Sequence, residues 1–193
     1  MASESLYRQT LRDAVTLFES LRALEPAVHN AAQLCIEALH ARHKLLICGN
    51  GGSSSEAQHL AGELMGRYKL NRAPLPAIAL TADTAVITCV GNDYCYEDVF
   101  ERQLRGLANR GDVLIAFSTS GNSPNVVQAL SAARELGIAS IAFLGSDGGK
   151  ARQLATCALV AAHSDTARAQ EAHQFLMHCM MDEIEVAFPA GRE

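Results

Sequence analysis

The sequence predicts an α/β fold: a doubly wound, five-stranded parallel sheet flanked by helices and preceded by two N-terminal helices. Three observations lead to this prediction. Short apolar runs recur along the chain, glycine or serine and then a helical pattern follow most of them, and residues 4–42 show helical periodicity alone. Continuous apolar runs are typical of strands that are buried on both faces, and their alternation with helices indicates a parallel sheet.

The N-terminal segment predicts two consecutive helices. Apolar side chains recur at helical spacing through residues 4–42, and the pattern breaks only at Glu25-Pro26. Proline is tolerated in the first turn of a helix, so Pro26 can open the second one.

The rest of the chain alternates predicted strands with predicted helices. The strands are expected at 45–48, 77–80, 113–117, 141–144 and 158–160. The crossover helices are expected at 54–68, 95–109, 123–137 and 150–155, and a long helix closes the chain at 166–187. Open parallel sheets bind ligands at the carboxyl ends of their strands, which directs attention to the loops that start at Gly49, Thr81 and Ser118.

Composition narrows the class of protein. A length of 193 residues suits a single domain (1–193), with a helical pair at 1–43 and the α/β core with its closing helix at 44–193. A net charge of -5 argues against a broad nucleic-acid surface. No signal-like start and no long apolar run occur, and the six cysteines lack CxxC pairing. We therefore expect a cytoplasmic protein with free thiols, no membrane span and no nucleic-acid partner.

Two loops have the composition of phosphate sites. Residues 49–56 combine glycines and serines and run into a helix, and residues 118–124 place four hydroxyl side chains before another. Free N–H groups at a helix start attract anions. The alternative for either loop is a tight turn with helix caps and no ligand, and neither matches a P-loop or a dinucleotide fingerprint. Their joint presence favours a phosphate-bearing small molecule.

Polar side chains on two helices are candidates for a metal site. His59 and Glu63 share one face at i and i+4, a spacing that is also common in plain surface pairs. Gln170, His173 and His178 interrupt an apolar closing helix. Their alternative is a set of satisfied core or interface groups, and we keep that interpretation for His173. Gln170 and His178 lie about 12 Å apart along the axis, so they reach one ion only with extended side chains.

Four strings together resemble a known family. GNGGSSSEAQH (49–59), VGNDY (90–94), STSGNS (118–123) and QEAH (170–173) with a later histidine are similar to motifs of the phosphoheptose isomerases in the sugar isomerase (SIS) superfamily, whose fold is flavodoxin-like. The resemblance implies phosphate binding by Ser53, Ser118, Thr119, Ser120 and Ser123. It implies sugar contacts from Asn50, Gly51, Gly52, Asn92 and Asp93, with Glu63 and Gln170 also at the substrate.

The same resemblance implies a cofactor, a reaction and an assembly. Zn²⁺ would be held by His59, Glu63, Gln170 and His178. Glu63 would abstract a carbon-bound proton and His178 would shuttle protons on oxygen, which turns D-sedoheptulose 7-phosphate into D-glycero-D-manno-heptose 7-phosphate through an enediol. The product would feed lipopolysaccharide or another surface glycan. Family members form homotetramers with sites between subunits.

Two other classes remain open. One is a non-catalytic SIS-domain protein, such as a bacterial replication-initiation partner that lacks the Glu and C-terminal His equivalents. The other is a sensor or isomerase for another sugar phosphate. The presence of Glu63 and His178 favours the enzyme. Two positions depart from the family pattern: Cys95 stands where glycine is common, which we interpret as drift at a helix start, and Ala169 replaces a larger aliphatic residue.

Overall fold

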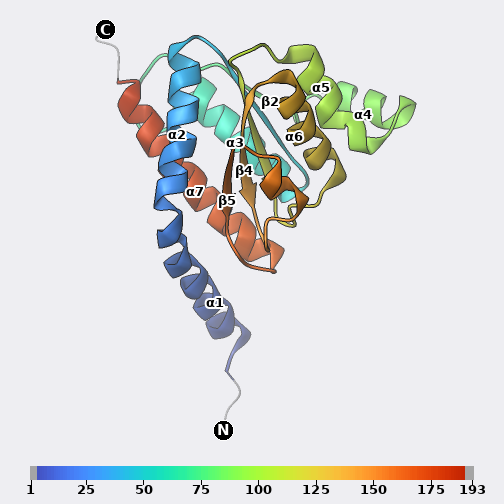
Figure 1. Cartoon of the computed structure of the whole chain (residues 1–193). Helices are drawn as coiled ribbons and strands as arrows, with labels where there is room; N and C mark the ends of the chain where they lie inside the picture. Colours follow the sequence, from blue (N-terminus) through green and yellow to red (C-terminus); the bar gives the residue numbers. More distant parts are fainter. Residues whose placement is uncertain (1–3, 190–193) are drawn as a thin grey trace.

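The chain forms a three-layer α/β structure in the computed structural model, which describes residues 4–189 (Figure 1). The sheet has five parallel strands in the order β2-β1-β3-β4-β5. Their bounds are β1 Leu45–Gly49, β2 Ala77–Ala79, β3 Val113–Ser118, β4 Ala139–Leu144 and β5 Cys157–Val160. The predicted doubly wound parallel sheet is confirmed.

The two N-terminal helices are confirmed and follow each other without a break. Helix α1 covers Leu6–Ser20, a 3-10 turn covers Leu21–Leu24, and α2 covers Glu25–His40 with proline in its first turn. Together they form one long rod, and α1 extends beyond the body of the molecule (Figure 1). None of the helices within residues 4–189 combines the length and apolar character that crossing a membrane requires.

Each strand sends alternate side chains to opposite faces, so the sheet has two cores. Leu45 and Ile47 of β1 pack with α2, with α3 (Gly52–Met65) and with α7 (Thr166–Ala187). Leu46 and Cys48 pack on the other face, with α4 (Thr84–Asp93), α5 (Val99–Leu107) and α6 (Pro124–Leu136). Burial on both faces explains why the strands are continuous apolar runs in the sequence.

The connection between β2 and β3 differs from the expectation of one helix at 95–109. It holds α4, a 3-10 turn at Tyr96–Asp98, and α5. Helix α4 is rich in β-branched residues, whose helix propensity is low, so its sequence gave no helical signal. Packing overrides that propensity: Val90 is buried, and Val86 and Ile87 lie against the same core.

The strand order reverses between β1 and β3. Gly49 at the end of β1 is in register with Phe117 of β3, so the loops after the two strands start side by side. Helix α3 then packs on one face of the sheet and α6 on the other. A crevice of this kind, at the carboxyl ends of parallel strands, is the usual ligand position in such folds.

Candidate active site

Residues 49–53, the glycine loop, lead from β1 into α3. Gly51 is the N-cap, with a φ of 55° that favours glycine, and no side chain caps the helix. Ser53, Ser54 and Ser55 lie inside the first turn and therefore do not cap the helix. The first N–H groups of α3 have no side-chain acceptor from the cap position, which suits an anion.

Residues 118–123, the serine loop, lead from β3 towards α6. The Ser118 hydroxyl lies 3.2 Å from that of Ser123 and accepts a hydrogen bond from the backbone N–H of Gly121 at 3.1 Å. The Ser120 hydroxyl accepts from the N–H of Asn122 at 3.1 Å. Ser123 is the N-cap of α6 but makes no capping hydrogen bond. The hydroxyls of Ser118 and Ser123 thus lie together before α6, where Pro124 has no N–H and the N–H of Val126 already donates to the Asn125 side chain at 3.0 Å.

The two loops are joined by a pair of amides. Asn50 donates to Asn125 at 2.8 Å, and Asn125 donates back at 2.9 Å. The Tyr96 hydroxyl donates to the same Asn50 oxygen at 3.0 Å. Asn50, expected to line the sugar, therefore already bridges the loops. Sequence reasoning missed Asn125, and its only signal was a polar residue directly after Pro124.

Asn92 and Asp93 make no hydrogen bond to the other predicted site residues within residues 4–189. Both are exposed in the last turn of α4, where Asn92 donates to Asp93 at 2.7 Å. Helix α4 covers the face of the sheet opposite to α7, and among residues 4–189 neither side chain makes a hydrogen bond to either loop or to α7. Cys95 lies in an extended conformation before the 3-10 turn, rather than at a helical position.

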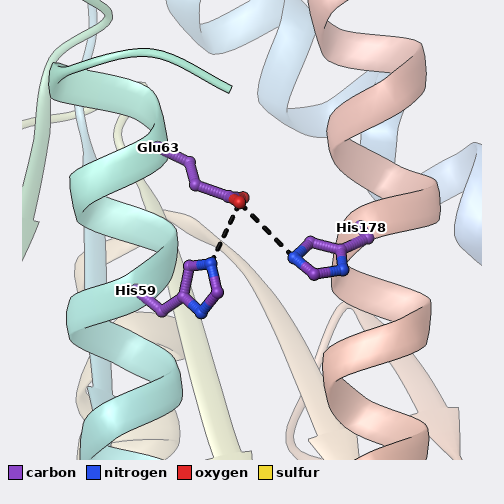
Figure 2. A group of neighbouring side chains, drawn as sticks. All are labelled: His59, Glu63 and His178. Atoms are coloured by element: carbon purple, nitrogen blue, oxygen red, sulfur yellow. Dashed lines mark hydrogen bonds and ion pairs between the residues drawn. The ribbon is translucent and has the colours of Figure 1, made fainter. Parts of the chain in front are cut away.

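His59, Glu63 and His178 come together between α3 and α7 (Figure 2). The Oε1 atom of Glu63 lies 3.0 Å from Nε2 of His59 and 3.4 Å from Nε2 of His178. One ligand atom from each residue falls within 4.8 Å of the others. We call this group the triad. Two imidazoles and one carboxylate with converging donor atoms are a set that fits a zinc ion.

The triad is partly open to solvent, and its carboxylate is the most enclosed member. Side-chain exposure is 46% for His59, 35% for His178 and 13% for Glu63. The second oxygen of Glu63, Oε2, is buried and has no hydrogen-bond partner within residues 4–189. A buried carboxylate oxygen without a partner is unusual and carries a desolvation cost that a bound ligand or water would relieve.

Gln174 contacts both imidazoles, and sequence reasoning missed it. Its amide nitrogen lies 3.2 Å from Nδ1 of His59 and 2.9 Å from Nε2 of His178. Gln170, expected as a ligand, lies instead against the glycine loop: a Cβ on Gly52 would come within 2.3 Å of its amide nitrogen. The signal for Gln174 was its i−4 spacing from His178 on the same helix.

Other aromatic and polar groups surround the triad. The ring of Tyr68 stacks on His178 with centroids 5.7 Å apart, and burial raises the pKa of Tyr68 above its usual value. His173 is fully buried beside Phe117 and Phe143, with its Nδ1 3.8 Å from Glu56. The core position agrees with the interpretation kept for His173, but its hydrogen bonds are not satisfied, because neither ring nitrogen has a partner within residues 4–189.

Comparison with known proteins shows which family this chain resembles in sequence and structure. The model of the SIS domain family matches residues 7–145. A phosphoheptose isomerase of Helicobacter pylori (strain P12) is 45% identical over 188 residues, which cover 97% of this chain and 98% of the relative. This chain belongs to the phosphoheptose isomerase family.

Solved structures of the phosphoheptose isomerase family share the whole fold. The enzyme from Neisseria gonorrhoeae superimposes with a TM-score of 0.87 at 40% identity, covering 92% of this chain and 96% of that one. The enzyme from Francisella tularensis gives a TM-score of 0.91 at 34% identity, with coverage of 96% and 100%. The match therefore includes α7, which lies beyond the SIS domain model and carries His178.

Proposed function

We propose that this protein isomerises D-sedoheptulose 7-phosphate to D-glycero-D-manno-heptose 7-phosphate. The observation that carries the proposal is the convergence of Glu63 with two histidines in a member of the phosphoheptose isomerase family. An aldose-ketose isomerase needs a base at carbon and a proton carrier at oxygen, and a carboxylate beside imidazoles supplies both.

The substrate phosphate is proposed to bind across the two loop-to-helix junctions. Ser53, Ser118, Thr119, Ser120 and Ser123 would donate hydroxyl hydrogen bonds, and the N-terminal N–H groups of α3 would favour the negative charge. Asn50, Gly51, Gly52 and Gln170 would line the sugar. We also propose that Asn92 and Asp93 contact the sugar. This contact requires a substrate or a partner surface that reaches α4.

The proton transfers are proposed to divide between Glu63 and His178. Glu63 removes the proton from C1 of the ketose through its carboxylate and returns it to C2, so that one C–H bond breaks and another forms. His178 takes the proton from the O1 hydroxyl and delivers a proton to O2, because imidazole exchanges protons near neutrality. Zn²⁺ held by His59, Glu63, Gln170 and His178 would polarise the substrate carbonyl.

The setting of the reaction follows from the same family assignment. We infer a cytoplasmic homotetramer with sites between subunits, formed by a single domain of residues 1–193, that supplies heptose for lipopolysaccharide or a related surface glycan. The exposed apolar side chains of α1, which include Leu6, Tyr7 and Leu11, support an assembly that covers them.

The proposal is tested by direct turnover. Zinc-loaded protein is incubated with sedoheptulose 7-phosphate, fructose 6-phosphate or an amino-sugar phosphate, and products are followed by ¹³C NMR of the new anomeric carbon. Formation of an aldoheptose phosphate from the first substrate alone supports the proposal. Preference for another sugar phosphate would reassign the substrate, and turnover of none by folded, zinc-loaded protein would indicate a binding role.

A further inference from the structure

The C-terminal end of α3 is closed by a buried arginine from the following loop. The last carbonyls of a helix have no partner within the helix. Arg72 Nη2 donates to the carbonyl of Glu63 at 2.7 Å, and Nη1 donates to the carbonyls of Leu64 at 2.8 Å and Ala73 at 3.1 Å. A cation at this end of a helix is also favoured by the helix dipole.

The charge of Arg72 is matched by Glu185 on α7. Their side chains are 1% and 4% exposed, with Nε of Arg72 3.7 Å from Oε1 of Glu185. Glu185 also accepts hydrogen bonds from the backbone N–H groups of Lys69 at 3.1 Å and Leu70 at 3.0 Å. Removing either partner of this buried pair would leave the other charge uncompensated, which is costly.

This pair connects the two helices that build the triad. Arg72 contacts the backbone of Glu63 itself on α3. Glu185 lies seven residues after His178 on α7, which is about two turns along the same side of that helix. The relative position of the Glu63 carboxylate and the His178 imidazole therefore depends on a contact that touches neither side chain.

We propose that Arg72 and Glu185 are positioning residues that set Glu63 against His178 in the triad. The inference rests on the proposed function for its turnover readout, but its zinc readout is independent of turnover. Lysine would be a poor substitute for Arg72, because one ammonium cannot span two carbonyls as a planar guanidinium does.

The test compares two variants that each break a buried ion pair. Arg72→Met removes the helix clamp. Lys44→Met is the matched control, since the Lys44 ammonium lies 2.6 Å from the buried Asp112 and, within residues 4–189, makes no hydrogen bond to a triad residue. Tm is measured for both, together with zinc affinity by isothermal titration calorimetry and with kcat and KM on sedoheptulose 7-phosphate.

Both variants are expected to lose thermal stability, but only Arg72→Met should affect the site. Its zinc Kd should rise at least about tenfold, the usual scale for losing an outer contact of a metal site. Its kcat should fall by about 30-fold with KM within about threefold, because small displacements of catalytic groups mainly slow the chemical step. Arg72→Lys should give intermediate values.

Glu185→Gln keeps an acceptor for Lys69 and Leu70 and tests the pair if Arg72→Met does not fold. A folded Arg72→Met or Glu185→Gln variant with wild-type zinc affinity and kcat would overturn the inference. Losses of zinc affinity and kcat in Lys44→Met equal to those in Arg72→Met would also overturn it. If the wild type binds zinc but does not turn over the heptose, the proposed function fails, and the zinc comparison alone decides the positioning role.

Discussion

Among single residues, the two glutamines of α7 show how a side chain near the triad differs from a side chain that can serve as a ligand. Gln174 presents its amide nitrogen to both imidazoles, which fits neutral rings that keep lone pairs on those atoms. Nε2 of His178 also faces Glu63, so the Gln174 amide and a metal in the triad would compete for its lone pair. Gln170 instead lies over Gly52, beside the proposed sugar position.

Replacing each glutamine with alanine separates these roles. Gln170→Ala is expected to raise the zinc Kd at least about tenfold, because it removes the carboxamide oxygen that the family resemblance assigns to the metal. Gln174→Ala should leave the Kd within about threefold, since no lone-pair donor is lost. Isothermal titration calorimetry measures both, and the reverse order of effects would make Gln174 the ligand.

The candidate site could be predicted in part. The i,i+4 spacing placed His59 and Glu63 on one helix face, and the glycine and serine strings located both loops. Residue spacing did not predict the approach of His178 to Glu63, which only the family resemblance implied, because it depends on how α7 packs beside α3. The Asn50 and Asn125 pair was missed for the same reason, since its two members lie 75 residues apart.

Among the elements, the strand starts are held by a buried carboxylate. Asp112, directly before β3, accepts hydrogen bonds from the Lys44 ammonium at 2.6 Å and from the backbone N–H groups of Lys44 at 3.0 Å and Asn109 at 2.7 Å. Burial alone would raise the pKa of Asp112, but these hydrogen bonds outweigh it and lower the pKa below its usual value. The stabilisation is therefore complete above the unfolded-state pKa of about 3.9 and is lost as the pH falls through the folded-state pKa.

Asp112→Asn is expected to lower the free energy of unfolding at pH 7 by on the order of 2 kcal/mol, because hydrogen bonds to a charged group are lost. The difference from wild type should shrink below about pH 4, where the unfolded wild-type carboxyl is protonated as well. Urea denaturation from pH 3 to 8 measures both. Asp182→Asn, in an exposed pair with Lys69, serves as the control and should change stability by less than about 0.5 kcal/mol. A constant Asp112→Asn deficit at every pH would contradict this account.

The helices and strands that could be predicted from the sequence are those with a clear pattern of buried apolar residues. All five strands and α7 were expected because continuous apolar runs and a sustained helical period are unambiguous. Helix α4 was not expected, because β-branched residues that favour strands fill it and only packing on the sheet makes it helical. The start of α3 was displaced because Gly51, rather than a serine, supplies the cap.

In the whole molecule, the long N-terminal rod leaves an apolar surface. A groove of about 880 Å³ lies between α1, α2 and α7 and is lined by apolar residues that include Val15, Phe18 and Phe175. The rings of Phe18 and Phe175 contact each other there in a tilted arrangement with centroids 5.2 Å apart, and Phe175 and Val15 are about half exposed. An apolar groove of this extent is typical of a surface that is covered in an assembly.

Sedimentation at micromolar concentration is expected to give a homotetramer. Contacts between subunits would remove the groove and the exposed apolar side chains of α1 from water, which is favourable. Phe175→Glu should shift the mass towards dimers or monomers. Leu107→Glu, which changes an exposed leucine on the opposite face of the sheet, should leave it unchanged. A stable wild-type monomer would rule out sites between subunits.

The most direct test of the central claim is turnover of sedoheptulose 7-phosphate in D₂O by wild type and Glu63→Gln. Transfer by a carboxylate that exchanges with solvent should place deuterium at C2 of the wild-type product and, through the reverse reaction, at C1 of the remaining ketose. Glu63→Gln should slow both turnover and exchange at least about a hundredfold while remaining folded. Wild-type rates of exchange in Glu63→Gln would show that another group moves the carbon-bound proton.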